Sequence, residues 1–168
     1  MLIGKPNTSF VGHKPDETAI NDMEFCAVLL DRGQSVEAWT LLHRQAESIP
    51  SQFNKAICLI RVEEYASALP LLEQVLGILA QTPQGLKTPE SPSLRTIQDV
   101  QATTKAYTEA ITFKYAELFP ETLKDSVLRM MVDCHAALGN HNKVLEIGTP
   151  LKSKGYQNVI DAIKKVEL

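Results

Sequence analysis

Hydrophobic residues recur at helical spacing through most of the chain, and the clearest example lies between Phe53 and Leu79. Apolar side chains stand three and four positions apart in two blocks there, which predicts two amphipathic helices. The members are Phe53, Ala56, Ile57 and Ile60 in the first block and Ala68, Leu72, Val75, Leu76 and Leu79 in the second. The corner between them, Val62 to Tyr65, has neither Gly nor Pro, so we expect a short hydrogen-bonded turn. Two such helices leave an apolar flank uncovered, which predicts that further hairpins stack on this one.

Two more helices are predicted before this hairpin. The first runs over about 17–31, and Gly33 can close it in a left-handed conformation. The second runs over about 35–48 and ends at Pro50. Residues 1–16 mix glycine and proline with isolated apolar groups, so we predict a flexible lead-in there.

The rest of the chain begins with an expected loop and continues in helices. The segment 81–93 carries three prolines, one glycine and no apolar period, which predicts an inserted loop. Residues 94–119 keep a helical period, but paired threonines in the middle leave open whether they form one helix or two with a corner. Three further helices are predicted over about 121–138, 142–148 and 157–166.

Similar short corners recur along the chain and indicate a repeat. Each precedes the second helix of a predicted pair and ends on a small or β-branched residue. The corners are Gly33 to Ala38, Val62 to Ala68, Lys105 to Ala110 and Gly139 to Val144. The closing residues Ala38, Ala68, Ala110 and Val144 lie 30, 42 and 34 positions apart. Insertion of the 81–93 loop accounts for the longest gap in a repeat of about 34 residues.

On these residues the chain resembles the tetratricopeptide-repeat (TPR) family over roughly 17–152, with 157–166 similar to the family's capping helix. Pro50 falls where the terminal proline of the motif belongs, and Tyr65 matches the aromatic residue before the crossing alanine. Three positions depart from the motif. Its first-helix Trp, Gly and large aromatic residue are replaced by Asp22, Cys26 and Leu29.

The resemblance implies an all-α fold, a right-handed superhelix of three to four helical hairpins closed by a C-terminal capping helix. It would form a single domain over 17–168, with the 81–93 loop inserted into it. A small residue at each helix crossing, such as Ala38 or Ala68, would let the paired helices approach closely. The alternative is a helical-hairpin bundle without superhelical order.

Composition is that of an ordinary globular protein. Of 168 residues, 44% are hydrophobic and 22% charged, and the net charge is −3 with no run of basic residues, which does not favour nucleic acid or an anionic membrane as a partner. No apolar run approaches the roughly 20 residues of a membrane span, so membrane insertion is not expected. The first residues lack the parts of a secretory signal. Cys26, Cys58 and Cys134 lie far apart in apolar patterns, which indicates reduced thiols and a cytoplasmic location.

Motifs with recognisable chemistry are missing from the sequence. It contains no Gly-rich phosphate loop, paired Cys-x-x-Cys or His-Glu-x-x-His motif, so we expect no cofactor, no metal and no enzymatic activity. Cys134 and His135 are adjacent, but neighbouring side chains on a helix diverge. Cys134 belongs to an apolar stripe and is expected to be an inert core thiol.

The resemblance also implies that the first helix of each hairpin lines a concave groove. The positions predicted to line it are almost all apolar, which favours binding of an amphipathic helix or an extended apolar segment of a protein or peptide. These positions are Met23, Ala27, Leu30, Phe53, Asn54, Ile57, Ile60, Met130 and Cys134. Only Asn54 matches the clamp with which some family members hold acidic chaperone tails, so such tails are not expected. Alternatively, the chain covers the groove itself, with Leu2 to Val11 or with residues 94–119.

The predicted function is that of a protein-interaction module, an adaptor or scaffold that binds its partner in this groove. One alternative is a dedicated chaperone for a secreted or assembly subunit. The other is a structural subunit of a permanent oligomer, which would use the same apolar surfaces for homo-oligomer contacts.

Overall fold

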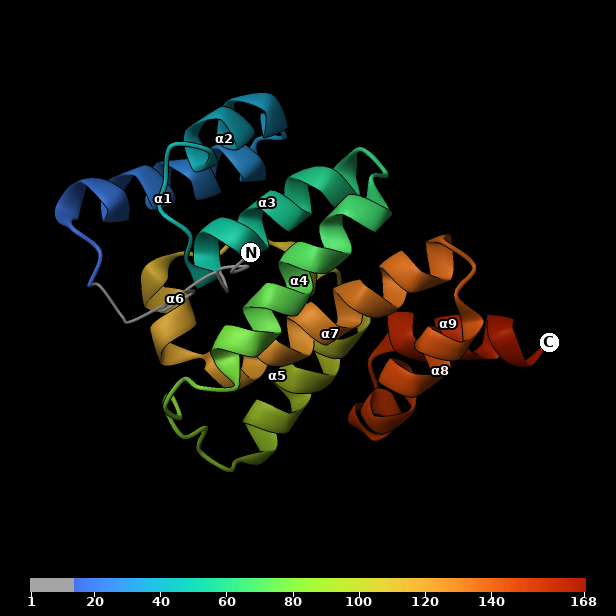
Figure 1. Ribbon diagram of the computed structural model, residues 1–168. Helices are drawn as coiled ribbons and strands as arrows, with labels where there is room; N and C mark the ends of the chain where they lie inside the picture. Colours follow the sequence, from blue (N-terminus) through green and yellow to red (C-terminus); the bar gives the residue numbers. More distant parts are fainter. Residues whose placement is uncertain (1–13) are drawn as a thin grey trace, which may run out of the picture.

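The computed structural model describes residues 14–168, and this part of the chain is all-helical, with no strand. The helices form a stack in which α1 and α2 lie at one end and α8 and α9 at the other (Figure 1). Most of the predicted lead-in over 1–16 falls outside the described residues. The same holds for the whole of Leu2 to Val11, one of the two segments considered as a cover for the groove.

The first hairpin consists of α1 (Glu17–Asp31) and α2 (Ser35–Leu42). The side chain of Asp16 accepts a hydrogen bond of 2.8 Å from the backbone N–H of Ala19 and so caps the start of α1. The bounds of α1 are those that the apolar period predicts.

The second predicted helix is shorter than expected, and Pro50 has a different role. α2 ends at Leu42 and does not extend through 35–48. Ser48 and Ser51 form a reciprocal capping box that starts α3 (Ile49–Arg61). Pro50 lies in the first turn of α3, where its missing N–H costs no helical hydrogen bond. The proline therefore begins the next helix and does not end the previous one.

Two further hairpins and a final helix follow the same scheme. α3 pairs with α4 (Tyr65–Leu79), and α7 (Pro120–Ala137) pairs with α8 (His141–Gly148). A 3-10 segment, η2 (Thr149–Lys154), leads to α9 (Gln157–Glu167), which packs on α7 and α8.

The three hairpins turn through the same corner. Gly33, Glu63 and Gly139 all have positive φ, at 77°, 63° and 71°. The residue after each donates its N–H to the carbonyl five residues back, at 2.8, 2.9 and 2.9 Å in chain order. This is the left-handed cap that ends many helices, and glycine adopts it without strain. The corner at Val62 to Tyr65 is short and hydrogen-bonded, as the sequence predicts.

Of the two alternatives left open for residues 94–119, the structure has two helices that are separated at the paired threonines, although these helices do not form a fourth hairpin. α5 (Pro92–Thr103) ends at the paired threonines, and η1 (Ala106–Thr108) is a single 3-10 turn. The chain then runs extended to α6 (Phe113–Leu118). The predicted corner at Lys105 to Ala110 is therefore wrong.

The segment from η1 to α6 packs against helices of the first two hairpins and against α7. α4 packs directly on α7 although 40 residues separate them in sequence, and η1 and α6 contact α7 while α6 also contacts α3. One large hydrophobic cluster joins α1, α2, α3, α4 and α7 with the segment around Tyr107, Ile111 and Ala116. A smaller cluster holds α7, α8 and α9 together.

Candidate functional site

The predicted groove residues come together in space, but most of them are core. Met23, Leu30, Phe53, Asn54, Ile57, Met130 and Cys134 are buried, and Ala27 and Ile60 are partly buried. Tyr107, Ile111 and Ala116 pack in the same cluster, so part of residues 94–119 covers the groove. The side chains expected to meet a partner are thus occupied by the chain itself.

Asn54 holds the covering segment by its backbone. Its Nδ2 donates to the carbonyl of Ile111 at 2.8 Å, and the N–H of Ile111 donates to Asn54 Oδ1 at 2.9 Å. Nδ2 also lies 3.3 Å from Met23 Sδ. All of these atoms are buried away from water, so the Asn54 amide supplies the hydrogen-bond partners that the backbone N–H and carbonyl of Ile111 would otherwise lack. In the sequence, Asn54 is the one amide within an apolar helical stripe, and this feature could have indicated that it bonds a buried backbone group.

Arg129 of α7 is the centre of a second polar cluster, which the sequence analysis did not identify. Its guanidinium lies between two tyrosine rings, 3.9 Å from the ring centre of Tyr107 and 4.4 Å from that of Tyr156. The side chain is only 4% exposed. Burial lowers the pKa of the guanidinium, while the two tyrosines and nearby aspartates oppose this shift. Arginine nevertheless stays protonated in proteins.

The same guanidinium ties three elements together. Nη2 donates to the carbonyls of Ala102 and Thr104, both at 3.2 Å, and so fixes the end of α5. Nε donates to Asn158 Oδ1 at 2.9 Å, which joins α7 to α9. Nη1 has no acceptor among residues 14–168. Within this range, Gln52 Oε1 is the only fully buried side-chain nitrogen or oxygen that lacks a hydrogen-bond partner. Nη1 of Arg129 also lacks a partner, so it must be partly exposed.

A cleft of about 630 Å³ opens beside Arg129, between α5, the η1–α6 segment, α7 and the start of α9. Its apolar and aromatic lining comprises Leu94, Ala102, Tyr107, Tyr115, Phe119 and Tyr156. Its polar lining includes the side chains of Gln98, Gln101, Asp125, Ser126, Arg129 and Lys154. α5 forms one wall and is anchored mainly at its C-terminal end, where Ala102 is its one buried residue.

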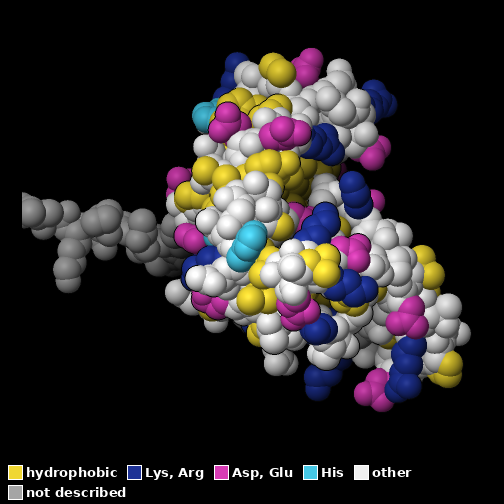
Figure 2. All heavy atoms as spheres, turned by 90° about the vertical axis from the view of Figure 1, so that its right-hand side faces the viewer, with side chains coloured by type: hydrophobic (Ala, Val, Ile, Leu, Met, Phe, Trp, Pro, Cys, Tyr) yellow, Lys and Arg dark blue, Asp and Glu magenta, His cyan; other side chains and the backbone are white. Residues whose placement is uncertain are grey.

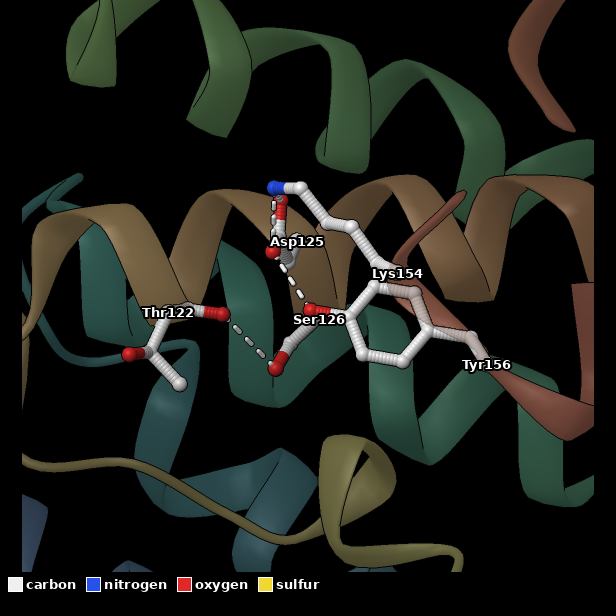
Figure 3. A network of polar contacts seen from close by, with 5 residues as sticks. All are labelled: Thr122, Asp125, Ser126, Lys154 and Tyr156. Atoms are coloured by element: carbon white, nitrogen blue, oxygen red, sulfur yellow. Dashed lines mark hydrogen bonds and ion pairs between the residues drawn. The ribbon is translucent and has the colours of Figure 1, made fainter. Parts of the chain in front are cut away.

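Asp125 is fixed at the edge of this cleft by two residues from the η2–α9 connection (Figure 3). Lys154 Nζ lies 2.8 and 2.7 Å from its two carboxylate oxygens, and the hydroxyl of Tyr156 donates to Oδ2 at 2.5 Å. Burial and the bond to Asp125 raise the pKa of Tyr156. Nearby, Ser126 Oγ donates to the carbonyl of Thr122 at 3.1 Å. The carboxylate is therefore already neutralised from within the chain.

The cysteines are buried and unreactive in character. Burial raises the pKa of Cys26 and of Cys134 to about 12 and that of Cys58 to about 11. His135, next to Cys134 in sequence, lies with Nδ1 3.3 Å from Nδ2 of Asn140. Within the described range, no three His, Cys, Asp or Glu side chains lie close enough together to hold a metal ion.

Neither sign of charge dominates the face of the molecule that Figure 2 shows. Figure 2, which views the molecule from the right-hand side of Figure 1, shows acidic and basic side chains interspersed over that face. Between residues 14 and 168, no helix is both long enough and apolar enough to cross a bilayer.

Comparison with protein-family models, with curated proteins and with solved structures finds no match to this chain. A functional conclusion therefore depends on the geometry of the cleft and of the groove that Ile111 fills.

Proposed function

We propose that this chain is a non-enzymatic protein-interaction module with a TPR-like arrangement, and that it binds a segment of a partner protein in the cleft beside α5. Three hairpins with the same left-handed corner support the repeat, and the packing of α9 on the last hairpin supports its role as a capping helix. Because Ile111 and its neighbours fill the groove, the cleft beside α5 is the concavity to which we assign the partner.

The unpartnered Nη1 of Arg129 carries this proposal. The guanidinium is fixed by three hydrogen bonds and two aromatic rings and so cannot turn away, and Arg129 lines the cleft, so we expect its free N–H groups to be available to a ligand there. A buried cation with open donors favours an anionic group on the ligand. The aromatic lining offers apolar contact beside it, as in most ligand sites.

The charge around the cleft decides which anion fits. Asp99 and Asp125 also line it, and Lys154 is already paired with Asp125. A dianionic phosphate would meet the carboxylate of Asp99, unpaired among the described residues, and only one open arginine edge, so a single carboxylate is the better fit. The proposed ligand is a short protein segment with an acidic side chain next to an apolar or aromatic one.

Selection of a random peptide library on the immobilised full-length chain tests this function. We expect enriched peptides to combine an acidic with an apolar residue. Gln98→Glu, which adds a negative charge to the cleft wall, should weaken their binding by about tenfold. The matched control is Gln34→Glu, at the exposed α1–α2 corner far from the cleft, which should leave binding unchanged. Failure to enrich any peptide, or equal binding by both variants, would contradict the proposal.

A further inference from the structure

The two ends of the helical stack differ in character. At the C-terminal end, α9 buries Val159, Ala162 and Ile163, while Lys164 and Lys165 are exposed. At the other end, the outer face of α1 and α2 exposes apolar side chains and no described residue covers it. Phe25 is 57%, Val28 43% and Val36 77% exposed. Terminal units of a stack ordinarily carry a polar outer face, and the apolar outer face of α1 and α2 departs from this rule.

A shallow hollow of about 380 Å³ lies on this outer face, between α1 and α2. Phe25 and Leu29 line it from α1, and Val36 and Leu41 line it from α2. Only two charged residues line the hollow, Glu37 and Arg44, and they have opposite signs. Neither of them forms an ion pair within the described part of the chain.

The spacing of the two charges is self-complementary. Glu37 lies in the first turn of α2, and Arg44 lies two residues beyond the end of this helix at Leu42. Both line the hollow, so they lie on the same face of the molecule, near opposite ends of α2. The midpoint of the sequence between them falls between Thr40 and Leu41. A two-fold axis through that midpoint would exchange the two positions, which is the condition for an interface that a surface makes with its own copy.

We propose that a second copy of this chain docks on the outer face of α1 and α2. The two α2 helices would run antiparallel across the two-fold axis, and Glu37 of each subunit would pair with the partner's Arg44. Phe25, Val36 and Leu41 would form the apolar centre of the contact, surrounded by these pairs. A different partner protein would need an acidic and a basic side chain at the same spacing as Glu37 and Arg44. A second copy of this chain necessarily has them.

Sedimentation equilibrium of the full-length chain across the micromolar concentration range tests this proposal. The wild type should show a monomer–dimer equilibrium. Glu37→Arg alone, or Arg44→Glu alone, places like charges opposite each other twice per dimer and should weaken dimerisation by about tenfold. The double variant Glu37→Arg with Arg44→Glu restores both pairs in reverse and should recover the wild-type dissociation constant.

Two apolar-to-charged variants locate the interface. Val36→Glu should abolish dimerisation, since it introduces charge at the centre of the contact. The matched control is Val100→Glu on α5, which is 59% exposed in the wild type and should leave the dimer unchanged. A wild type that stays monomeric overturns the proposal. A dimer that is lost only in Val100→Glu also overturns it, because the interface then lies on another face. A dimer that forms only after residues 1–13 are deleted overturns it too, because the chain's own N-terminal segment then occupies the face.

Discussion

The side-chain amide of Asn54 pairs with both backbone groups of Ile111, as a neighbouring β-strand would. The two hydrogen bonds, of 2.8 and 2.9 Å, join α3 to an extended segment 57 residues further along the chain. This contact converts the inner side of the first two hairpins from an open groove into core. It also places the η1–α6 segment where it forms one wall of the cleft beside Arg129.

Ile57 should behave as a core residue. It is 2% exposed, so Ile57→Glu forces a carboxylate into an apolar cluster and should reduce the free energy of unfolding by about 4 kcal/mol or more. The matched control, Ile97→Glu on α5, starts from a side chain that is 55% exposed and should change stability by less than about 0.5 kcal/mol. Thermal unfolding followed by circular dichroism distinguishes them. A well-folded Ile57→Glu variant would show that the groove is open.

The α3–α4 corner should gain stability from glycine. Glu63 adopts a φ of 63°, where an L-residue with a side chain is strained, so Glu63→Gly should stabilise the protein by about 1 kcal/mol. At the equivalent α1–α2 corner, Gly33→Ala should destabilise by a similar amount, although a Cβ there meets no atom within 4 Å. Urea unfolding measures both changes. Effects of the same sign at the two corners would contradict the shared geometry.

The loop before α5 is fixed by a close approach at Gly85. A Cβ at this position would lie 2.3 Å from the carbonyl oxygen of Leu118 and 2.4 Å from Cδ of Pro120. Gly85→Ala should therefore lower stability by about 1–3 kcal/mol and expose the loop to proteases. In Gly77→Ala, within α4, the added methyl meets nothing within 4 Å and should stabilise by about 0.5–1 kcal/mol. Equal protease sensitivity of the two variants would show that the loop does not pack there.

Alkaline pH should unfold the protein through its buried acids. Burial first, and the neighbouring aspartates next, raise the pKa of Tyr107 and Tyr156, and burial raises that of Cys26 to about 12 from its ordinary 9.0. The fold therefore favours the neutral forms. The contribution of these groups to stability should be constant below pH 9.0 and be lost as pH rises through the raised values, because the unfolded chain releases these protons more readily. Urea midpoints measured across this range test the slope, which should be shallower in Tyr107→Phe.

The sequence was informative wherever structure depends on local signals. The apolar period predicted α1, α4, α7 and α9 nearly to their ends, since each helix buries one continuous face. The corners at Gly33 and Gly139 were recognisable because glycine is favoured at positive φ. Pro50 was ambiguous, since proline can follow a helix or begin one, and the capping pair Ser48 and Ser51 decided between them.

Contacts across the chain were not predictable in the same way. Tyr107 and Ile111 have helical spacing, yet Tyr107 lies in a 3-10 turn and Ile111 in an extended stretch, and both side chains are buried there. The backbone of Ile111 is held by Asn54, and the ring of Tyr107 packs on the guanidinium of Arg129, and both of these partners are distant in sequence. Arg129 gave no signal, because a single arginine within a helix ordinarily lies on the solvent side. Its burial is favoured by Tyr107 and Tyr156 and by three hydrogen-bond acceptors, all of them distant in sequence.

Amide hydrogen exchange at Ile111, measured by NMR, tests whether the chain itself fills the groove. We expect protection of this N–H close to that of core amides in α3, because it is buried and bonded to Asn54 Oδ1. In Asn54→Leu, which leaves both backbone groups unpaired at a cost of about 2–4 kcal/mol, the protection should be lost at Ile111 before it is lost in α3. Exchange of Ile111 at the rate of an exposed loop in the wild type, or unchanged protection in the variant, would contradict the account.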